Sequence, residues 1–138
     1  MKYNIENNIE PTEYNRLRNT IGWDSKDENL IKTAIEKSAI VKSIRDNDKT
    51  VGMARAIGDG LYYLIVDVVV DKDYQGKGLG KILIEEIAKE VYDRTKIGQK
   101  ASIILISMQG KEEFYEKCGF RKVPFDFTGY GMMRNIQK

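Results

Sequence analysis

The residues best suited to chemistry form a short glycine-rich stretch, Gln75–Lys81, which reads QGKGLGK. An apolar run, Leu61–Val70, precedes it, and a helical pattern, Lys81–Arg94, follows it. A turn between a strand and a helix can point several backbone N–H groups at one place, where the positive end of the helix dipole favours an anion. Glycine lets this backbone approach a ligand closely, and Lys77 or Lys81 adds positive charge. The stretch therefore predicts a phosphate-binding turn.

Three phosphate-binding patterns can be compared with this turn. A Walker loop is excluded because Gln75 occupies the position of its first glycine and Ile82 that of its Ser or Thr. A dinucleotide fingerprint, G-x-G-x-x-G, is excluded because it requires glycine at position 81 or 83. The pattern Q-x-x-G-x-G is satisfied by Gln75, Gly78 and Gly80, and its N–H groups converge on a pyrophosphate. The remaining alternative is a glycine-rich turn that only connects strand and helix.

The side chains available for catalysis are few, because the sequence contains no histidine and Cys118 is its only cysteine. Ser-His-Asp and Cys-His nucleophiles and His-based or thiolate zinc sites are therefore excluded. Asp67 is the one charged residue inside the apolar run. It could act as a base or proton relay, or as a structural anchor; we favour the anchor, with a water chain as base. Cys118 could carry an acyl group, but no base neighbours it in sequence.

Length and composition predict one domain over residues 1–138. The net charge of +2 comes from interspersed acidic and basic residues, which is not the basic patch of a nucleic-acid-binding protein. No apolar stretch is long enough to predict a membrane span, and the N-terminus has no apolar signal region. A lone cysteine fits a reducing compartment, so we expect a cytoplasmic protein that binds neither nucleic acid nor membrane.

The elements that must position these residues alternate between strand and helix periodicity, in the order βααβββαβαββ. This order predicts an α+β fold, a mixed sheet with helices on both faces. Leu61–Val70 and Lys100–Met108 are apolar on both faces, so we expect them to be central and covered on both faces. We also expect them to be adjacent, and the crossover helix between them requires that they run parallel. Ser25 or Asp24 is expected to cap the second helix, with Glu28 completing a capping box. The other expected strands are Lys2–Ile9, Ala39–Asn47, Lys49–Gly58, Phe120–Val123 and Tyr130–Ile136, and the expected helices are Thr12–Gly22, Lys26–Ser38, Gly78–Thr95 and Gly110–Phe120.

Two segments, VDVVVDKDYQGKGLGKILIEEI and FYEKCGF, resemble the GNAT superfamily of N-acetyltransferases, which bind acetyl-coenzyme A. The resemblance covers nearly the whole chain, and a minor departure is Lys72, where many members carry proline. It implies that the pyrophosphate is held by Gln75, Gly76, Lys77, Gly78, Leu79, Gly80 and Lys81. It also implies that the strand ending at Val68, Val69 and Val70 diverges from its neighbour at the C-terminal end and offers backbone groups to the pantetheine arm. It also implies that the Val68 amide faces the thioester carbonyl and that Tyr115 protonates the departing thiolate. Tyr115 could instead be a packing aromatic beside Phe114 and Phe120.

The function implied is acetyl transfer from acetyl-CoA, without a metal, to a primary amine by direct attack in a ternary complex. The acceptor is expected to be a small molecule, because no peptide-binding insertion is visible. Trp23 and Arg18, in the region that overhangs the acceptor pocket in this family, could contact it, although packing explains Trp23 equally well. Asp67 is the third candidate for contact with the acceptor. The alternative is a non-catalytic module that senses acetyl-CoA or binds a partner, and a homodimer is compatible with the sequence.

Overall fold

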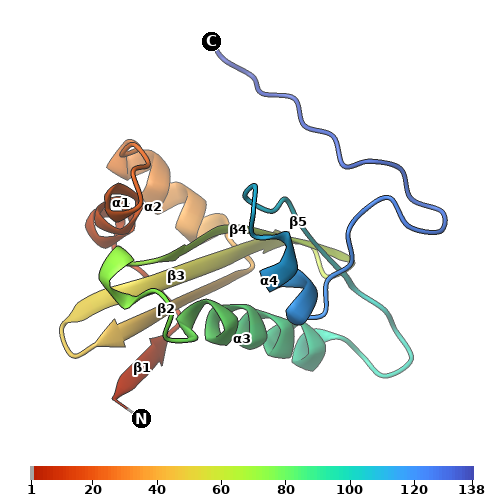
Figure 1. Cartoon of the computed structure of the whole chain (residues 1–138), viewed down its shortest axis with the longest axis horizontal. Coiled ribbons are helices and arrows are strands. Elements are labelled where there is room, and N and C mark those ends of the chain that lie inside the picture. Colours follow the sequence, from red (N-terminus) through yellow and green to blue (C-terminus); the bar gives the residue numbers. More distant parts are fainter. Residues whose placement is uncertain (1) are drawn as a thin grey trace. The chain divides into compact units, whose positions relative to one another are not determined.

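A five-stranded mixed sheet forms the centre of the computed structural model, which describes residues 2–138 (Figure 1). Its spatial order is β1-β2-β3-β4-β5, with antiparallel neighbours from β1 to β4 and a parallel pair β4–β5. The strands are β1 (Tyr3–Glu6), β2 (Ile40–Asp46), β3 (Lys49–Gly58), β4 (Tyr62–Val70) and β5 (Ser102–Leu105). The predicted mixed sheet and the parallel pair are confirmed, and β2 and β3 form a hairpin. β5 lies at the edge of this sheet, not at its centre.

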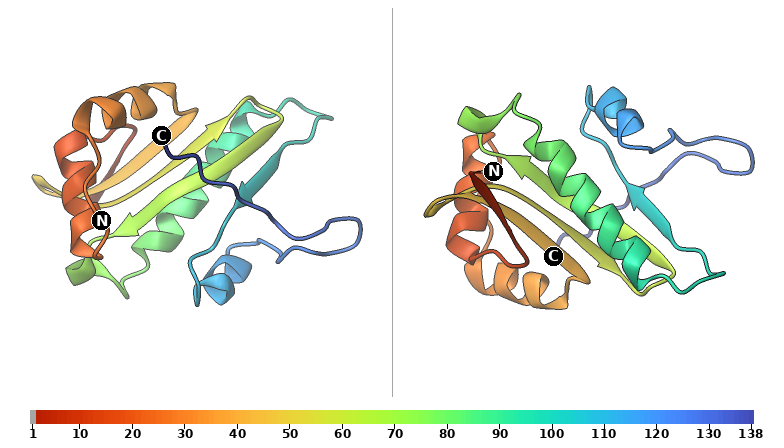
Figure 2. Two further views of the ribbon diagram at one scale, coloured as in Figure 1. Left: turned by 90° about the horizontal axis from the view of Figure 1, so that it is seen from above. Right: turned by 90° about the horizontal axis from the view of Figure 1, so that it is seen from below.

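Helices cover the two faces of this sheet (Figure 2). The helices α1 (Pro11–Thr20) and α2 (Glu28–Lys37) lie on one face, and α3 (Leu79–Arg94) lies on the other. The α1/α2 side buries an apolar cluster, and the α3 side buries the apolar stripe of that helix. The cluster on the first side comprises Ile9, Tyr14, Leu17, Ile31, Met53 and Val69, and the α3 stripe comprises Leu79, Leu83, Ile84, Ile87 and Val91.

The second helix begins later than the sequence pattern indicates. Asp27 is its N-cap, and its side chain accepts a hydrogen bond from the Leu30 N–H at 2.9 Å. The predicted cap at Ser25 or Asp24 is therefore wrong. An N-cap oxygen must reach the N–H two or three residues ahead, and only Asp27 stands at that distance from the first turn. The Ser25 hydroxyl instead donates to the Asn19 side chain at 3.2 Å.

A β-bulge interrupts β4 at Asp67 and Val68. Met53 of β3 pairs with Val69, and Arg55 pairs with Val66, so two residues of β4 stand opposite one residue of β3. Asp67 has a left-handed backbone conformation, with φ of +57°. Strict alternation from the buried Ile65 would place Asp67 on the α3 face, but the bulge turns its side chain toward α1.

Within residues 2–105, the side chains on both faces are buried along only part of β4. Tyr63 and Ile65 are buried, whereas Leu64 is 37% exposed beside its exposed cross-strand neighbours Ile57 and Ile104. The prediction that both faces are covered throughout is therefore wrong for Leu64. The pairing with β5 is also short: it covers Tyr62 to Ile65 and stops where β5 ends.

The chain divides into two compact units, one reaching to Leu105 and one formed by residues 106–138. The second unit contains the helix α4 (Glu112–Lys117), on which the sequence places Tyr115. The expected strands Phe120–Val123 and Tyr130–Ile136 do not form; this part of the chain holds turns and extended backbone. A strand is stabilised by its ladder of hydrogen bonds, and among residues 2–138 no segment pairs with these two. No helix among the same residues is both long and apolar enough to span a bilayer.

Candidate functional site

The glycine turn joins the end of β4 to α3 and leaves its inner surface open. Gly76 and Gly78 have left-handed backbones, with φ of +78° and +82°, which glycine adopts without steric cost. A Cβ atom added at either position would meet no heavy atom within 4 Å. Gly78 immediately precedes α3, and Gly80 lies in the first turn of that helix. The turn therefore combines a helix N-terminus with backbone that no side chain shields.

The N–H groups of this turn are available to a ligand. Within the described part of the chain, no oxygen accepts a hydrogen bond from the N–H groups of Gly76, Lys77 or Gly78. The first N–H groups of α3, from Leu79 to Lys81, have no partner within their own helix by geometry. These donors point from a turn and a helix N-terminus, which is the arrangement that binds phosphate oxygens.

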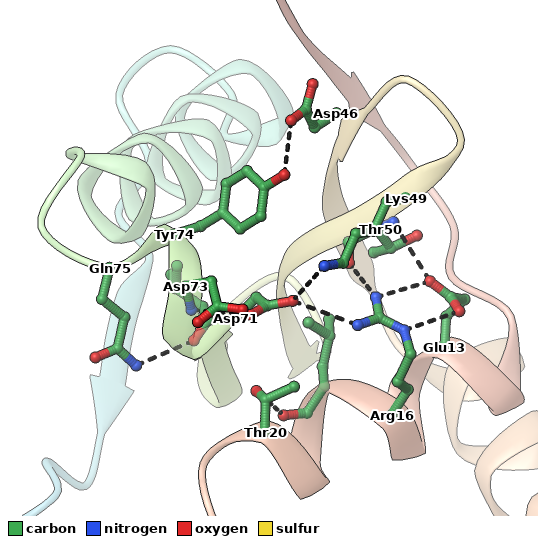
Figure 3. Close-up of polar contacts among 12 residues, drawn as sticks. Glu13, Arg16, Thr20, Asp46, Lys49, Thr50, Asp71, Asp73, Tyr74 and Gln75 are labelled. Atoms are coloured by element: carbon green, nitrogen blue, oxygen red, sulfur yellow. Dashed lines mark hydrogen bonds and ion pairs between the residues drawn. The ribbon is translucent and has the colours of Figure 1, made fainter.

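Gln75 contributes differently from the other residues of the turn. Its side-chain amide donates a hydrogen bond to the Val70 carbonyl oxygen at 3.1 Å, so it ties the turn back to the end of β4 (Figure 3). Tyr74, which precedes it, donates its hydroxyl to Asp46 of β2 at 2.7 Å. The side chains of Gln75 and Tyr74 thus hold the turn in place, and the backbone that follows them is left for the ligand.

Asp71 anchors the segment between β4 and the turn. It is buried, and its carboxylate accepts from the Asp73 N–H at 3.0 Å and lies 3.3 Å from Arg16 and 3.5 Å from Lys49 (Figure 3). Burial by itself raises the pKa of Asp71, but the backbone hydrogen bond and the charges of Lys49 and Arg16 outweigh it and hold the pKa below its usual value. Arg16 also binds Glu13 and the Thr50 carbonyl, so α1 and β3 are joined to the base of the turn.

Asp67, on the bulge, is surrounded by donors from two other elements. Its Oδ2 atom accepts from the Tyr14 hydroxyl of α1 at 2.7 Å and from Nε of Arg55 on β3 at 2.8 Å. Arg18 lies 3.7 Å from Oδ1. Burial and then the hydrogen bond to Asp67 raise the pKa of Tyr14 to about 12. The favoured reading of Asp67 as an anchor agrees with this arrangement, since both of its oxygens face donors.

Arg18 and Trp23 line a surface depression of about 610 Å³, with residues 22–26 forming the rest of its wall. The Arg18 guanidinium lies between two rings, 5.1 Å from the centroid of Trp23 and 5.8 Å from that of Tyr14. Its Nε donates to the Asp24 carbonyl oxygen at 2.8 Å. The depression is therefore lined by a half-buried indole and a fixed cation, and Arg18 connects it to Asp67.

Tyr115 belongs to the unit of residues 106–138. Its ring makes edge-to-face contacts with Phe114 and Phe120, at centroid distances of 5.0 and 6.1 Å. Burial, and secondarily the nearby Cys118, raise the pKa of the Tyr115 phenol. The hydroxyl therefore keeps its proton at neutral pH, as a general acid must. Cys118 lies half-buried at the end of α4.

The sequence predictions missed the partners of Asp67 and Asp71. An ionisable residue inside an apolar run needs a partner when it is buried, and this signal could have prompted a search for cations. The helical spacing of α1 places Tyr14 and Leu17 on its buried face, but it does not show which strand they meet. Arg55 interrupts an otherwise small and apolar strand, which is a second signal of the same kind.

Comparison with known proteins agrees with this geometry. Residues 37–122 match the family model of the acetyltransferase (GNAT) domain. A relative from the red alga Pyropia yezoensis, the uncharacterized N-acetyltransferase ycf52, is 34% identical over 127 residues, covering 88% of this chain and 71% of its own length. Histone acetyltransferase TAP1 of Glycine max is 32% identical, covering 82% of this chain and 52% of its own length.

A solved structure shares the architecture. The probable acetyltransferase SA2161 of Staphylococcus aureus is 26% identical and superposes with a TM-score of 0.79, over 96% of this chain and 99% of its own. The family match spans the β2–β3 hairpin, the bulged strand, the glycine turn and α4. The chain therefore belongs to the GNAT family of N-acetyltransferases.

Proposed function

We propose that this N-acetyltransferase moves the acetyl group of acetyl-CoA to a primary amine of a small molecule, by direct attack in a ternary complex. The observation that carries the proposal is the open glycine turn, whose N–H groups at Gly76, Lys77 and Gly78 have no acceptor within the described chain. The oxygens of a pyrophosphate can accept hydrogen bonds from these N–H groups, and the positive charges of Lys77 and Lys81 offset its negative charge.

The backbone of β4 next to the turn offers the second set of contacts. The β5 partner ends opposite Ile65, so Val66 to Val70 continue without a parallel neighbour in the sheet. An extended pantetheine arm can take the place of that neighbour through main-chain hydrogen bonds. The Val68 amide would then polarise the thioester carbonyl as an oxyanion-hole donor does.

Protons are handled by few groups in this proposal. The Tyr115 phenol, whose pKa is raised, donates to the sulfur as the thiolate leaves. Asp67 is a poor base, because its Oδ2 already accepts two hydrogen bonds and Arg18 lies beside its other oxygen. A water chain to solvent is left to take the proton of the amine.

The depression lined by Arg18 and Trp23 supports a small acceptor. It is a shallow surface depression with the half-buried indole of Trp23 in its wall, so it offers an aromatic contact to a small molecule. The soybean relative is named for histones, so a protein lysine is the second candidate acceptor. The Trp23 indole beside this depression favours an acceptor with an aromatic portion.

The test is a panel of primary amines, with release of free thiol from acetyl-CoA as the readout. Small arylalkylamines, amino sugars and a histone-tail peptide are compared at equal concentration. Turnover with a small amine and none with the peptide supports the proposal. Tight binding of acetyl-CoA without turnover of any amine supports the alternative, a sensing module. A protein that does not bind acetyl-CoA contradicts both the enzyme and the sensing module.

A further inference from the structure

We infer that Asp67 is a positioning residue: with Tyr14 and Arg55 it holds the β4 bulge in the conformation that aims the Val68 N–H at the acetyl carbonyl. The inference rests on the proposed function, since it assumes that this amide meets the thioester. The side chains of Asp67, Tyr14 and Arg55 would together make that amide available to the acetyl group.

The geometry of the peptide bond connects Asp67 to the amide. The N–H of Val68 belongs to the peptide plane that follows Asp67, so its direction is set by rotation about the Asp67 Cα–C bond. In this structure Asp67 has φ of +57°, a left-handed conformation that every residue except glycine adopts at a cost, although the cost is smaller for asparagine and aspartate. Something must hold the residue there, and a change at this residue turns the amide.

Two hydrogen bonds to the Oδ2 atom of Asp67 stabilise this conformation. Tyr14 reaches Oδ2 from α1 at 2.7 Å, and Arg55 reaches it from β3 at 2.8 Å. Each donor is itself fixed: the Tyr14 ring is buried in the apolar cluster, and Arg55 also donates to the Ser38 hydroxyl at 3.2 Å. The carboxylate therefore joins the bulge to a helix and to the neighbouring strand, and it cannot rotate without breaking both bonds.

Cations and a hydroxyl donor surround the Asp67 carboxylate. The groups that face it are the Arg55 and Arg18 guanidiniums and the Tyr14 hydroxyl, and the Asp67 side chain is only 14% exposed. Arg18 also lines the depression beside Trp23. The same carboxylate thus lies between the bulge and the surface proposed for the acceptor.

The experiment uses two ligands that differ only in the acetyl group. Calorimetric affinities for acetyl-CoA and for CoA are measured on the whole chain, and their ratio reports contact with the acetyl carbonyl. We expect the affinity of the parent for acetyl-CoA to be about five times its affinity for CoA, because one neutral hydrogen bond contributes about that factor. In Asp67→Gly, glycine tolerates the left-handed conformation but offers no carboxylate, so CoA affinity should persist while the preference falls to about one.

A graded series separates positioning from a general loss of structure. Asp67→Asn keeps one oxygen and should lie between the parent and Asp67→Gly. Tyr14→Phe keeps the buried ring and removes one donor, so it should lower the preference about twofold while the protein remains folded. Tyr63→Phe is the control: it alters another buried tyrosine, which lies on β4 as Asp67 does, and should leave the preference for acetyl-CoA as in the parent.

Each outcome decides the inference. A parent-like preference in Asp67→Gly and Tyr14→Phe overturns it and leaves the proposed function standing. If Asp67→Gly does not fold, Tyr14→Phe alone decides, by the same ratio. Equal affinities of the parent for CoA and acetyl-CoA would mean that no amide contacts the acetyl carbonyl, and this result would overturn the inference. A parent that binds neither ligand would overturn both the inference and the proposed function.

Discussion

Two places along one stretch of chain hold left-handed backbone, and they are held in different ways. At Gly76 and Gly78 no side chain occupies the space beside the backbone, and the conformation comes from the freedom of glycine. At Asp67 a charged side chain contacts a helix and a neighbouring strand. In the proposed function the turn needs an open surface, so that a bulky ligand group can approach its N–H groups. The bulge would need a fixed direction, because it would present one amide.

The largest expected effect tests the open surface. Gly78→Val should weaken the affinity for CoA about a thousandfold, because the added side chain blocks two or more charge-assisted hydrogen bonds, each of about 1.5–3 kcal/mol. Gly60→Val is the matched control: Gly60 is also left-handed, with φ of +97°, and is equally unobstructed, but it lies between β3 and β4 at the far end of the strand. Calorimetry should show the loss for Gly78→Val alone, and equal affinities in the two variants would contradict the assignment of the turn.

Tyr115→Phe should have the opposite signature, since an acid is needed only as charge develops on the leaving sulfur. We expect the turnover number to fall by about 10²–10⁴-fold while the KM for acetyl-CoA stays nearly constant. Steady-state kinetics with the best amine of the panel measures both constants. Turnover within a factor of a few of the parent would mean that Tyr115 only packs against Phe114 and Phe120.

Asp71→Asn sharpens the comparison by removing the anchor below the turn while leaving the glycines intact. The free energy of unfolding at neutral pH should fall by about 1.5–3 kcal/mol, the value of hydrogen bonds to a charged group. Because the folded-state pKa of Asp71 lies below its unfolded value, its contribution is present above about pH 4 and is lost as the pH falls through the folded pKa.

Denaturant unfolding of the parent and Asp71→Asn at several pH values measures this difference. The two stabilities should differ most near neutral pH and converge in acid. A gap that stays constant down to pH 2 would show that the carboxylate acts through its shape and not through its charge.

The smallest effect is spectroscopic and concerns the bulge. Because the pKa of Tyr14 is about 12, it should form no phenolate between pH 8 and 11, where an ordinary tyrosine with a pKa near ~10 ionises. The alkaline ultraviolet titrations of the parent and of Tyr14→Phe should therefore coincide up to about pH 11. An excess of one phenolate in the parent within that range would mean that Asp67 does not hold the Tyr14 proton.

Local patterns predicted most of the elements, because their cause lies within a few residues. The apolar stripe of α3 and the turn between β2 and β3 are visible in the sequence, and the open glycine turn follows from its own composition. The cap of α2 was misplaced by two or three residues, since several capping residues stand in a row before it.

Features that depend on distant pairing were not predictable in the same way. The bulge at Asp67 is a property of how β4 pairs with β3, and alternation within β4 alone cannot reveal it. The bond between Arg16 and Asp71 joins residues 55 positions apart. The closing strands expected after α4 had suitable residues, but a strand forms only where a neighbour supplies hydrogen-bonding groups.

The bonds that Gln75, Tyr74 and Asp71 make at the base of the turn bear on the kinetics of ligand capture. A loop shaped before its ligand arrives loses little conformational entropy on binding, and no slow rearrangement has to precede contact. The association rate constant for CoA should therefore depend on collision and on the two nearby lysines, Lys77 and Lys81, and should decline with ionic strength. Ligands that share the pyrophosphate but differ elsewhere should arrive equally fast and differ in how long they stay.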